Sequence, residues 1–398
     1  MKKIFLLVAI VATLCLTGCG SLGDKEIRDN FIKDIEGLKS YHMEGTLKLT
    51  NNDDNYEYDV EVSYQKDNNY KVSLINKASD YEQIILKNKE GVYVITPSLN
   101  KSFKFQSDWP ENNSQSYLLH SAATDLKNDN NYNFTQKDND YIFQTKTNYP
   151  NNPKYTKQNI ILDKNYNLKK IEVQDDQNIS YIEFKVENID KKAKFNESEF
   201  SLDEITKNYK EQDNQNNSET TTKENQNEGT TNQETTTDQK TPENESQNTT
   251  TNQNRENTTN TSEESDSQRE NENTENTNTN ETSKVDENVF PLYLPAGTTL
   301  SDKEVIETTT GERVIMTFSG DNPFILVQET VKPSKNLEII PTYGEPFMLI
   351  DTVGSLTDTS YTWTSNGVEY YIVSDQMDKK ELLEVAKSIN VVSTINQK

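Results

Sequence analysis

A stretch of 74 residues, 211–284, contains no Ala, Val, Ile, Leu, Met, Phe, Trp, Tyr or Cys. It consists mainly of Thr, Asn, Glu, Gln and Ser. Because such a segment has no apolar surface to bury, nothing offsets the conformational entropy that ordering it would cost. We therefore predict a disordered linker over residues 204–288, between a folded N-terminal part and a folded C-terminal part. A spacer is the simpler interpretation, and a tether across the cell wall or an interaction tail is the alternative.

The chain is strongly acidic, with a formal net charge of −25. The apolar-free stretch holds 17 acidic and 5 basic residues, so it accounts for 5 − 17 = −12 of that charge. A charge of this sign repels nucleic acids and anionic membrane surfaces. We therefore expect no nucleic-acid partner.

The N-terminus has the features of a secretory signal. Two lysines in residues 1–3 precede an apolar run of 13 residues, Ile4–Leu16. A membrane-spanning helix needs about 20 apolar residues, so this run is too short to be one. We predict a signal peptide over residues 1–18.

The run ends in Leu16-Thr17-Gly18-Cys19, which matches the lipobox of bacterial lipoproteins. We expect cleavage between Gly18 and Cys19 and a diacylglycerol on the Cys19 thiol, with residues 19–23 as a lipidated N-terminus. The mature protein would then lie on the outer face of the cell membrane, with no other cofactor. A plain secretory signal that happens to contain Cys is the alternative. Since Cys15 leaves with the signal, no disulfide is possible.

Residues 24–203 alternate between helix and strand patterns. Ile27, Phe31, Ile35 and Leu38 recur at helical spacing after Asp24, a candidate N-cap. A second helix is predicted over 114–127, with Ser114 as its cap. Period-two alternation predicts strands at 46–50 and 56–64. Further strand signals lie at 70–75, 83–86, 92–96, 102–105, 132–135, 141–147, 158–162, 169–173 and 179–186.

This order predicts an α+β fold, in which a long, curved antiparallel sheet wraps around the helices and leaves an apolar concavity. Eight apolar or aromatic side chains could line this groove or make a contact: seven lie on alternating strand positions, and Trp109 lies in a loop after a strand. They are Tyr56, Tyr58, Val60, Val62, Tyr64, Phe103, Phe105 and Trp109. Packing in the sheet core is the alternative for each of them.

Residues 289–398 read as a small α+β domain. A helix is predicted over 378–388, with Asp378 as its cap, Glu381 completing a capping box and Met377 packing on Leu382. Asn366-Gly367 predicts a two-residue hairpin turn. Strands are predicted at 305–308, 313–318, 324–330, 347–350, 352–356, 361–364 and 368–373.

No motif of a known catalytic or metal site occurs in the chain. The two histidines, His42 and His120, lie far apart in the sequence and are expected to be isolated. No carboxylate stands in an apolar stretch beside a partner, as a perturbed acid/base pair would. We therefore predict no catalytic residues, no metal site and no enzyme activity.

Residues 92–110, Val-Tyr-Val-Ile-Thr-Pro-Ser-Leu-Asn-Lys-Ser-Phe-Lys-Phe-Gln-Ser-Asp-Trp-Pro, carry a family resemblance. The run is similar to the central stretch of the LolA/RseB-like half-barrel lipoproteins of spore-forming Gram-positive bacteria, the group of the sporulation protein YdcC and the germination lipoprotein GerS. The order of helices and strands resembles the wider LolA/LolB and RseB/MucB group.

The resemblance implies an open half-barrel that holds or senses acyl chains, or binds an envelope protein, without a catalytic centre. For the germination relative, that partner is understood to be a cortex amidase. We therefore expect a membrane-anchored binding scaffold for an acyl chain or an envelope protein, acting in sporulation or germination. An RseB-like envelope-stress sensor or regulator of a membrane protein is the alternative, and a wall enzyme is a third hypothesis that no residue supports.

Overall fold

The computed structural model describes residues 23–51, 54–111, 113–207, 209, 289–309, 311–349, 352–365 and 367–395. The signal peptide, Gly18, Cys19 and most of the predicted linker lie outside these residues. By its internal contacts the chain divides into two units, one formed by 1–213 with 282–398 and the other by 214–281. The N-terminal and C-terminal parts therefore belong to the same unit.

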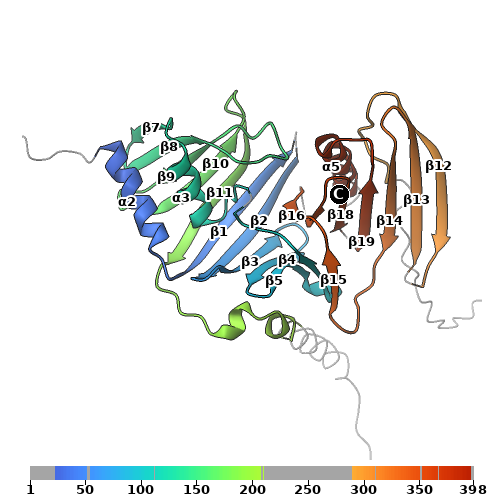
Figure 1. Ribbon diagram of the computed structural model, residues 1–398, viewed down its shortest axis with the longest axis horizontal. Helices are drawn as coiled ribbons and strands as arrows, with labels where there is room; N and C mark the ends of the chain where they lie inside the picture. Colours follow the sequence, from blue (N-terminus) through green and yellow to red (C-terminus); the bar gives the residue numbers. More distant parts are fainter. Residues whose placement is uncertain are drawn as a thin grey trace, which may run out of the picture. The chain divides into compact units, whose positions relative to one another are not determined.

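The N-terminal part is a sheet with helices against it (Figure 1). Its first half contains α2 (Asp24–Glu36), β1 (Ser40–Asn51), β2 (Asp54–Gln65), β3 (Asn69–Asn76), β4 (Glu82–Asn88), β5 (Gly91–Thr96), η1 (Pro97–Leu99) and β6 (Lys101–Phe105). Its second half contains α3 (Leu119–Asn128), β7 (Asn133–Lys137), β8 (Asp140–Lys146), β9 (Lys157–Leu162), β10 (Leu168–Gln174), β11 (Ser180–Asp190) and η2 (Glu197–Phe200). The strand order is β15-β6-β5-β4-β3-β2-β1-β11-β10-β9-β8-β7.

Alternation of apolar and polar residues explains which side of β2 is buried. Its five predicted inward residues, Tyr56 to Tyr64 at every second position, are all 7% exposed or less. The predicted helix face is also confirmed, because Ile27, Phe31 and Ile35 are buried in the same cluster. Arg28 fastens α2 to α3, donating hydrogen bonds to the carbonyls of Leu126 (3.1 Å) and Lys127 (2.9 Å) at the end of α3.

Strands β4 and β5 are covered on both faces. Ile84, Leu86, Tyr93 and Ile95 belong to a second apolar cluster, together with residues 200–205. The segment after β11 lies across this face, with residues 202–207 helical, and Asn88 Nδ2 donates to the Phe200 carbonyl at 2.9 Å. Because both faces of β5 are buried, its sequence is an unbroken apolar run and does not alternate with polar residues.

The C-terminal part is a second sheet with one helix packed on it. Its elements are β12 (Thr298–Glu307), β13 (Glu312–Gly320), β14 (Phe324–Thr330), β15 (Glu338–Thr342), β16 (Glu345–Met348), β17 (Val353–Leu356), β18 (Ser360–Ser365), β19 (Val368–Val373) and α5 (Lys379–Ile395). Seven of these strands form an antiparallel sheet in the order β12-β13-β14-β19-β18-β17-β16. The hairpin is confirmed, because Ser365 pairs with Val368 across a two-residue turn. Gly367 has φ +75° in that turn, as this geometry requires.

One strand of the C-terminal part joins the N-terminal sheet instead. β15 pairs in parallel with β6, from Glu338 opposite Lys101 to Thr342 opposite Phe105. The 12-stranded sheet is therefore mixed, and the expectation of a purely antiparallel sheet is wrong at this edge. The Lys101 ammonium also forms an ion pair with Glu369 of β19.

Two predicted helix caps are also wrong. Asp24 is the first residue of α2, and Gly23 takes the N-cap position without a side-chain bond. The second helix begins at Leu119, not Ser114, because the Ser114 hydroxyl instead donates to Asp125 Oδ2 at 2.7 Å. The predicted N-cap of the last helix, α5, is confirmed, since Asp378 Oδ1 accepts a hydrogen bond from the Glu381 amide at 2.8 Å. That helix runs on to Ile395, beyond the predicted end at 388.

Candidate binding site

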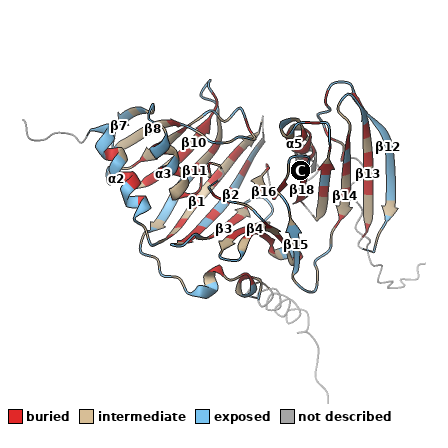
Figure 2. Ribbon diagram, viewed as in Figure 1, coloured by how far each residue is buried: buried red, intermediate tan, exposed pale blue. Residues whose placement is uncertain are grey.

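The structure places all eight predicted groove residues in the packed interior. The exposed fractions are 7% or less for Tyr56, Tyr58, Val60, Val62, Tyr64, Phe103, Phe105 and Trp109. Figure 2 shows this burial as alternating bands along the strands. Trp109 borders one hollow and Tyr64 borders another. The sequence pattern therefore located the sheet core, while the hollows are lined mainly by residues of loops and of α3.

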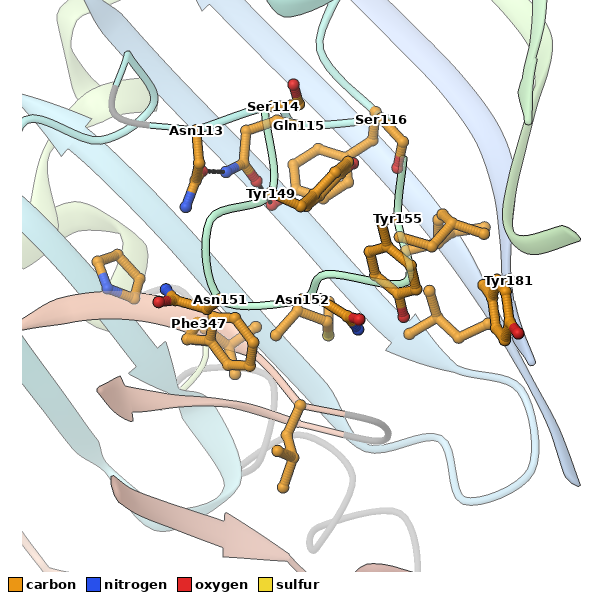
Figure 3. A pocket seen from close by; sticks show the side chains of 18 of the residues that line it. Asn113, Ser114, Gln115, Ser116, Tyr149, Asn151, Asn152, Tyr155, Tyr181 and Phe347 are labelled. Carbon is orange, nitrogen blue, oxygen red and sulfur yellow. Dashed lines mark hydrogen bonds between the residues drawn. The ribbon is translucent and has the colours of Figure 1, made fainter. Parts of the chain in front are cut away.

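The first hollow is small. It lies beside Leu47 and Leu49 of β1 and the loops around 113–117 and 149–155, and it has a volume of about 110 Å³. Figure 3 shows Tyr149, Tyr155 and Phe347 among the side chains around it. Small-molecule sites usually measure about 300–1,000 Å³, so this space is too small for a long acyl chain.

Phenols and amides, together with Lys154, Glu384 and Lys387, give this hollow its polar character. Burial raises the pKa of Tyr149 and of Tyr155, so both phenols stay protonated. Their rings meet edge to face at 5.3 Å. Asn151 Nδ2 donates to Glu345 Oε1 of β16 at 2.9 Å, which connects this loop to the C-terminal part.

A buried glutamine joins the two parts of the molecule more directly. Gln83 of β4 is 4% exposed, and its Nε2 donates to the Val353 carbonyl at 3.1 Å. Its Oε1 accepts from the Val353 amide at 2.6 Å and from the Thr352 hydroxyl at 3.1 Å. The side chain thus acts as a short strand partner for β17. One continuous apolar cluster also runs through both parts, with Ile85 and Leu382 among its members.

The second hollow is a larger cleft of about 590 Å³, bordered by the β2–β3 turn, α3 and the segments around 111 and 146–148. His120 lies within a group of aromatic rings, 4.3 Å from the Tyr64 ring and 6.2 Å from the Tyr70 ring. Burial lowers the pKa of His120 to about 4, so the imidazole is neutral near pH 7. Its Nδ1 is buried without a hydrogen-bond partner among the described residues.

Asp125 of α3 stands at the same cleft. Burial raises the pKa of its carboxyl to about 6, although hydrogen bonds from Ser114 and Gln158, both at 2.7 Å, act in the opposite direction. The sequence predicts that His120 is isolated, and no motif in it marks Asp125. The one signal available was the aromatic pair Tyr64 and Tyr70, which face each other across β2 and β3.

Exposed apolar side chains gather in the C-terminal part. Of the ten large hydrophobic residues that are exposed in the described ranges, one is in the N-terminal part, Ile179 at 53%. The other nine are Leu292, Tyr293, Leu294, Leu300, Val305, Ile325, Ile339, Tyr343 and Tyr371. Sequence reasoning missed this asymmetry, because alternation marks two faces of a strand without saying which of them stays uncovered.

Within the ranges that the structure describes, no helix has the length and apolar character needed to cross a membrane. Nor do three or more His, Cys, Asp or Glu side chains of the described residues come together as metal ligands would.

Comparison with known proteins shows which family the chain belongs to. No family model matches the chain. The sporulation protein YdcC of Bacillus subtilis (strain 168) is 31% identical over 399 residues, covering 98% of each chain. The chain belongs to the family of this sporulation protein. The membership expected from residues 92–110 is thereby confirmed.

Solved structures also resemble the chain. The MucA/MucB complex of Pseudomonas aeruginosa matches with 10% identity and a TM-score of 0.29, over 92% of this chain and 97% of that one. A LolA superfamily protein from Nitrosomonas europaea matches with 11% identity and a TM-score of 0.28, over 46% and 99%. The complex of the CwlD amidase with the GerS lipoprotein from Clostridioides difficile matches with 16% identity and a TM-score of 0.18, over 44% and 98%. At TM-scores this low, the likenesses carry no weight for function.

Proposed function

We propose that this protein is a scaffold that binds a protein partner in the cell envelope during sporulation, and that the lipid on Cys19 holds it at the outer face of the membrane. The observation that carries the proposal is the outer face of the C-terminal sheet, which no described residue covers. We call five residues on this face, Ile315, Ile325, Val327, Tyr371 and Val373, the outer patch. Membership in a family of sporulation proteins supports the setting.

Strand register places the outer patch on one surface. Ile315, Val327 and Tyr371 lie in one row across β13, β14 and β19, and Ile325 pairs with Val373 in the next row. The intervening residues, such as Leu326 and Ile372, point to the opposite face and are fully buried in the apolar cluster that includes residues of α5. Within the described part of the chain, α5 covers the opposite face and nothing covers the outer patch, so Ile325 is 40% and Tyr371 38% exposed.

Charged pairs border the outer patch at one end. Arg313 and Glu329 form an ion pair with a shortest distance of 2.7 Å, and Glu369 beside them pairs with Lys101. An apolar centre with aromatic residues and a polar rim is typical of protein–protein interfaces. A membrane surface fits less well, since the net charge of −25 opposes approach to anionic lipids.

The size of the first hollow and the polar lining of the second favour a protein over an acyl chain as the partner. The hollow beside β1 has about 110 Å³, and the larger cleft is bordered mainly by polar side chains, which an acyl chain would leave without partners. A carrier would need to open this core, which also contains the contacts of Gln83 with β17. A partner docked on the outer patch requires no such rearrangement.

The proposal can be tested by photo-cross-linking with the full-length lipidated chain in sporulating cells of its own host. A photoreactive residue at position 371 should give a discrete protein adduct, whereas one at the exposed control position 179 should not. Adding Ile325→Glu should reduce the adduct at position 371 at least tenfold, because it places a charge in the apolar centre. The scaffold proposal fails if both positions give the same pattern, or if Ile325→Glu leaves the adduct unchanged.

The tether is tested separately by Cys19→Ala. We expect this variant to leave the membrane fraction, since no lipid could then be attached. A variant that sediments with membranes as firmly as the parent protein would contradict the anchor without affecting the assignment of the outer patch.

A further inference from the structure

The cleft of about 590 Å³ beside α3 is not used by the proposed scaffold function. Its volume falls within the range of about 300–1,000 Å³ that is usual for small-molecule sites. Aromatic rings, short neutral polar groups, three carboxylates and one lysine border it. Together these restrict the chemistry of a ligand that would fit.

The aromatic side of the cleft is formed by Tyr64, Tyr70 and His120. The Tyr64 and Tyr70 rings are 4.8 Å apart, and Tyr64 lies 4.3 Å from the imidazole. Such rings present an apolar surface together with a polar edge. The Nδ1 of His120 is buried and has no hydrogen-bond partner in the described residues.

The carboxylates at the cleft are already engaged by protein donors. Glu111 accepts from Asn68 Nδ2 at 2.9 Å and from Lys87 Nζ at 3.1 Å. Asp125 accepts from two side chains, as described above, and Asp129 accepts backbone amides of Asn131 (2.9 Å) and Lys146 (2.8 Å). These groups therefore shape the cleft and do not form a set of free cation ligands.

The neutral polar side chains are differently placed. Thr124, Asn128, Asn130 and Asn131 all border the cleft, and their side chains make no hydrogen bond within the described residues. Each amide offers both donors and an acceptor, and the Thr hydroxyl offers one of each kind. Their ligand would therefore carry many hydroxyl or amide groups and no net charge.

From this combination we infer that the cleft beside α3 binds a neutral saccharide, with a sugar ring against the Tyr64–Tyr70–His120 side and its hydroxyl or acetamido groups on the side chains of Thr124 and the neighbouring asparagines. An anionic ligand would find a single basic residue, Lys146, on the border. An acyl chain would leave the amides without partners, at a cost in free energy for each group desolvated.

The test uses the purified full-length chain in detergent and two uncharged probes, the tetramer of N-acetylglucosamine and the tetramer of glucose. Calorimetric titration should show saturable binding of at least one tetramer, and the ratio of the two affinities then tells whether acetamido groups are recognised. Thr124→Arg should weaken that binding at least tenfold, because it places a long charged side chain in the cleft. Asn131→Ala should weaken it severalfold, by removing one amide.

Thr135→Arg on the exposed surface of β7 is the matched control and should leave the affinity within twofold. The inference is overturned if neither tetramer binds saturably, or if Thr124→Arg binds as tightly as the parent protein. Thr124→Arg should not alter the cross-link at position 371, so this site and the outer patch can fail independently.

Discussion

The two sheets differ in how much of their apolar surface the chain covers by itself. The 12-stranded sheet has α2 and α3 on one face and the segment 195–209 over β4 and β5 on the other, while β15 pairs with its β6 edge. The seven-stranded sheet has α5 on one face, and its edge strand β12 is exposed along most of its length. Other elements therefore cover most of the apolar side chains of the first sheet, whereas the second sheet keeps apolar side chains in contact with solvent.

The largest expected effect is a loss of stability when a buried side chain of the 12-stranded sheet is shortened. Phe184 of β11 is fully buried, and its ring lies so close to Gly45 that a Cβ there would be 2.7 Å from it. Phe184→Ala should therefore cost about 3–5 kcal/mol in the free energy of unfolding, measured by urea denaturation. Tyr371→Ala in the outer patch should cost less than about 0.5 kcal/mol. Similar costs for the two would remove the contrast between the sheets.

The next effect concerns the junction between the sheets. Gln83→Leu would leave the Val353 amide and carbonyl and the Thr352 hydroxyl without Gln83 as a partner, costing about 2–4 kcal/mol. The two tryptophans report on the two parts separately, Trp109 on the first and Trp363 on the second. In single-tryptophan versions, the two fluorescence transitions should coincide in the parent protein and separate after Gln83→Leu. The exposed control Gln177→Leu should leave them together.

A smaller effect concerns pH. With its pKa lowered to about 4, His120 contributes stability that is present above pH 6.5 and is lost as the pH falls toward 4. Asp125, with its pKa raised to about 6, contributes in the opposite sense, with stability that is present below pH 3.8 and lost as the pH rises through 6. In the parent protein these two slopes largely cancel.

Removing one of these two groups should reveal the pH dependence of stability that the other contributes. As the pH rises from 4 to 6, the free energy of unfolding of His120→Phe should fall by about 2 kcal/mol relative to that of the parent protein. That of Asp125→Asn should rise by about as much over the same range. Chemical denaturation at half-unit steps of pH measures both. Slopes of the same sign in the two variants would contradict the assignment.

The smallest effect on stability should come with a change in association. Ile325→Thr together with Tyr371→Thr should alter the free energy of unfolding by less than about 0.5 kcal/mol. Because the exchange removes exposed apolar area, it should reduce self-association at high protein concentration, as measured by sedimentation velocity. The exposed control Ile179→Thr should have little influence on it, and an equal reduction there would show that the outer patch is not special.

Local patterns predicted most of the elements. The Tyr56–Tyr64 alternation identified the buried face of β2, and the Asn366-Gly367 pair identified the β18–β19 hairpin. β15 escaped notice because it is only five residues long and contains Pro341, which a strand tolerates at an edge position such as this one. Its pairing with β6 has no local signature, since the two strands lie on opposite sides of the linker region.

The sites were less predictable than the strands. The eight aromatic and apolar candidates are all buried in the apolar cluster, although Trp109 and Tyr64 also border the two hollows. The His120 cleft depends on where α3 begins, and the engagement of Ser114 with Asp125 moved that start five residues along the chain. Whether the outer patch is exposed depends on whether a helix packs on that face of the sheet, and the alternation of residues along the strands does not indicate this.

The return of β15 to the first sheet has a consequence for chain continuity. The peptide between residues 213 and 282 connects two segments that β-pairing, the Gln83 contacts and a shared core already hold together. A protease that nicked the chain there should produce two polypeptides that still migrate as one particle. Fragment complementation, in which residues 20–213 and 282–398 are expressed apart and reassemble, should be possible for the same reason.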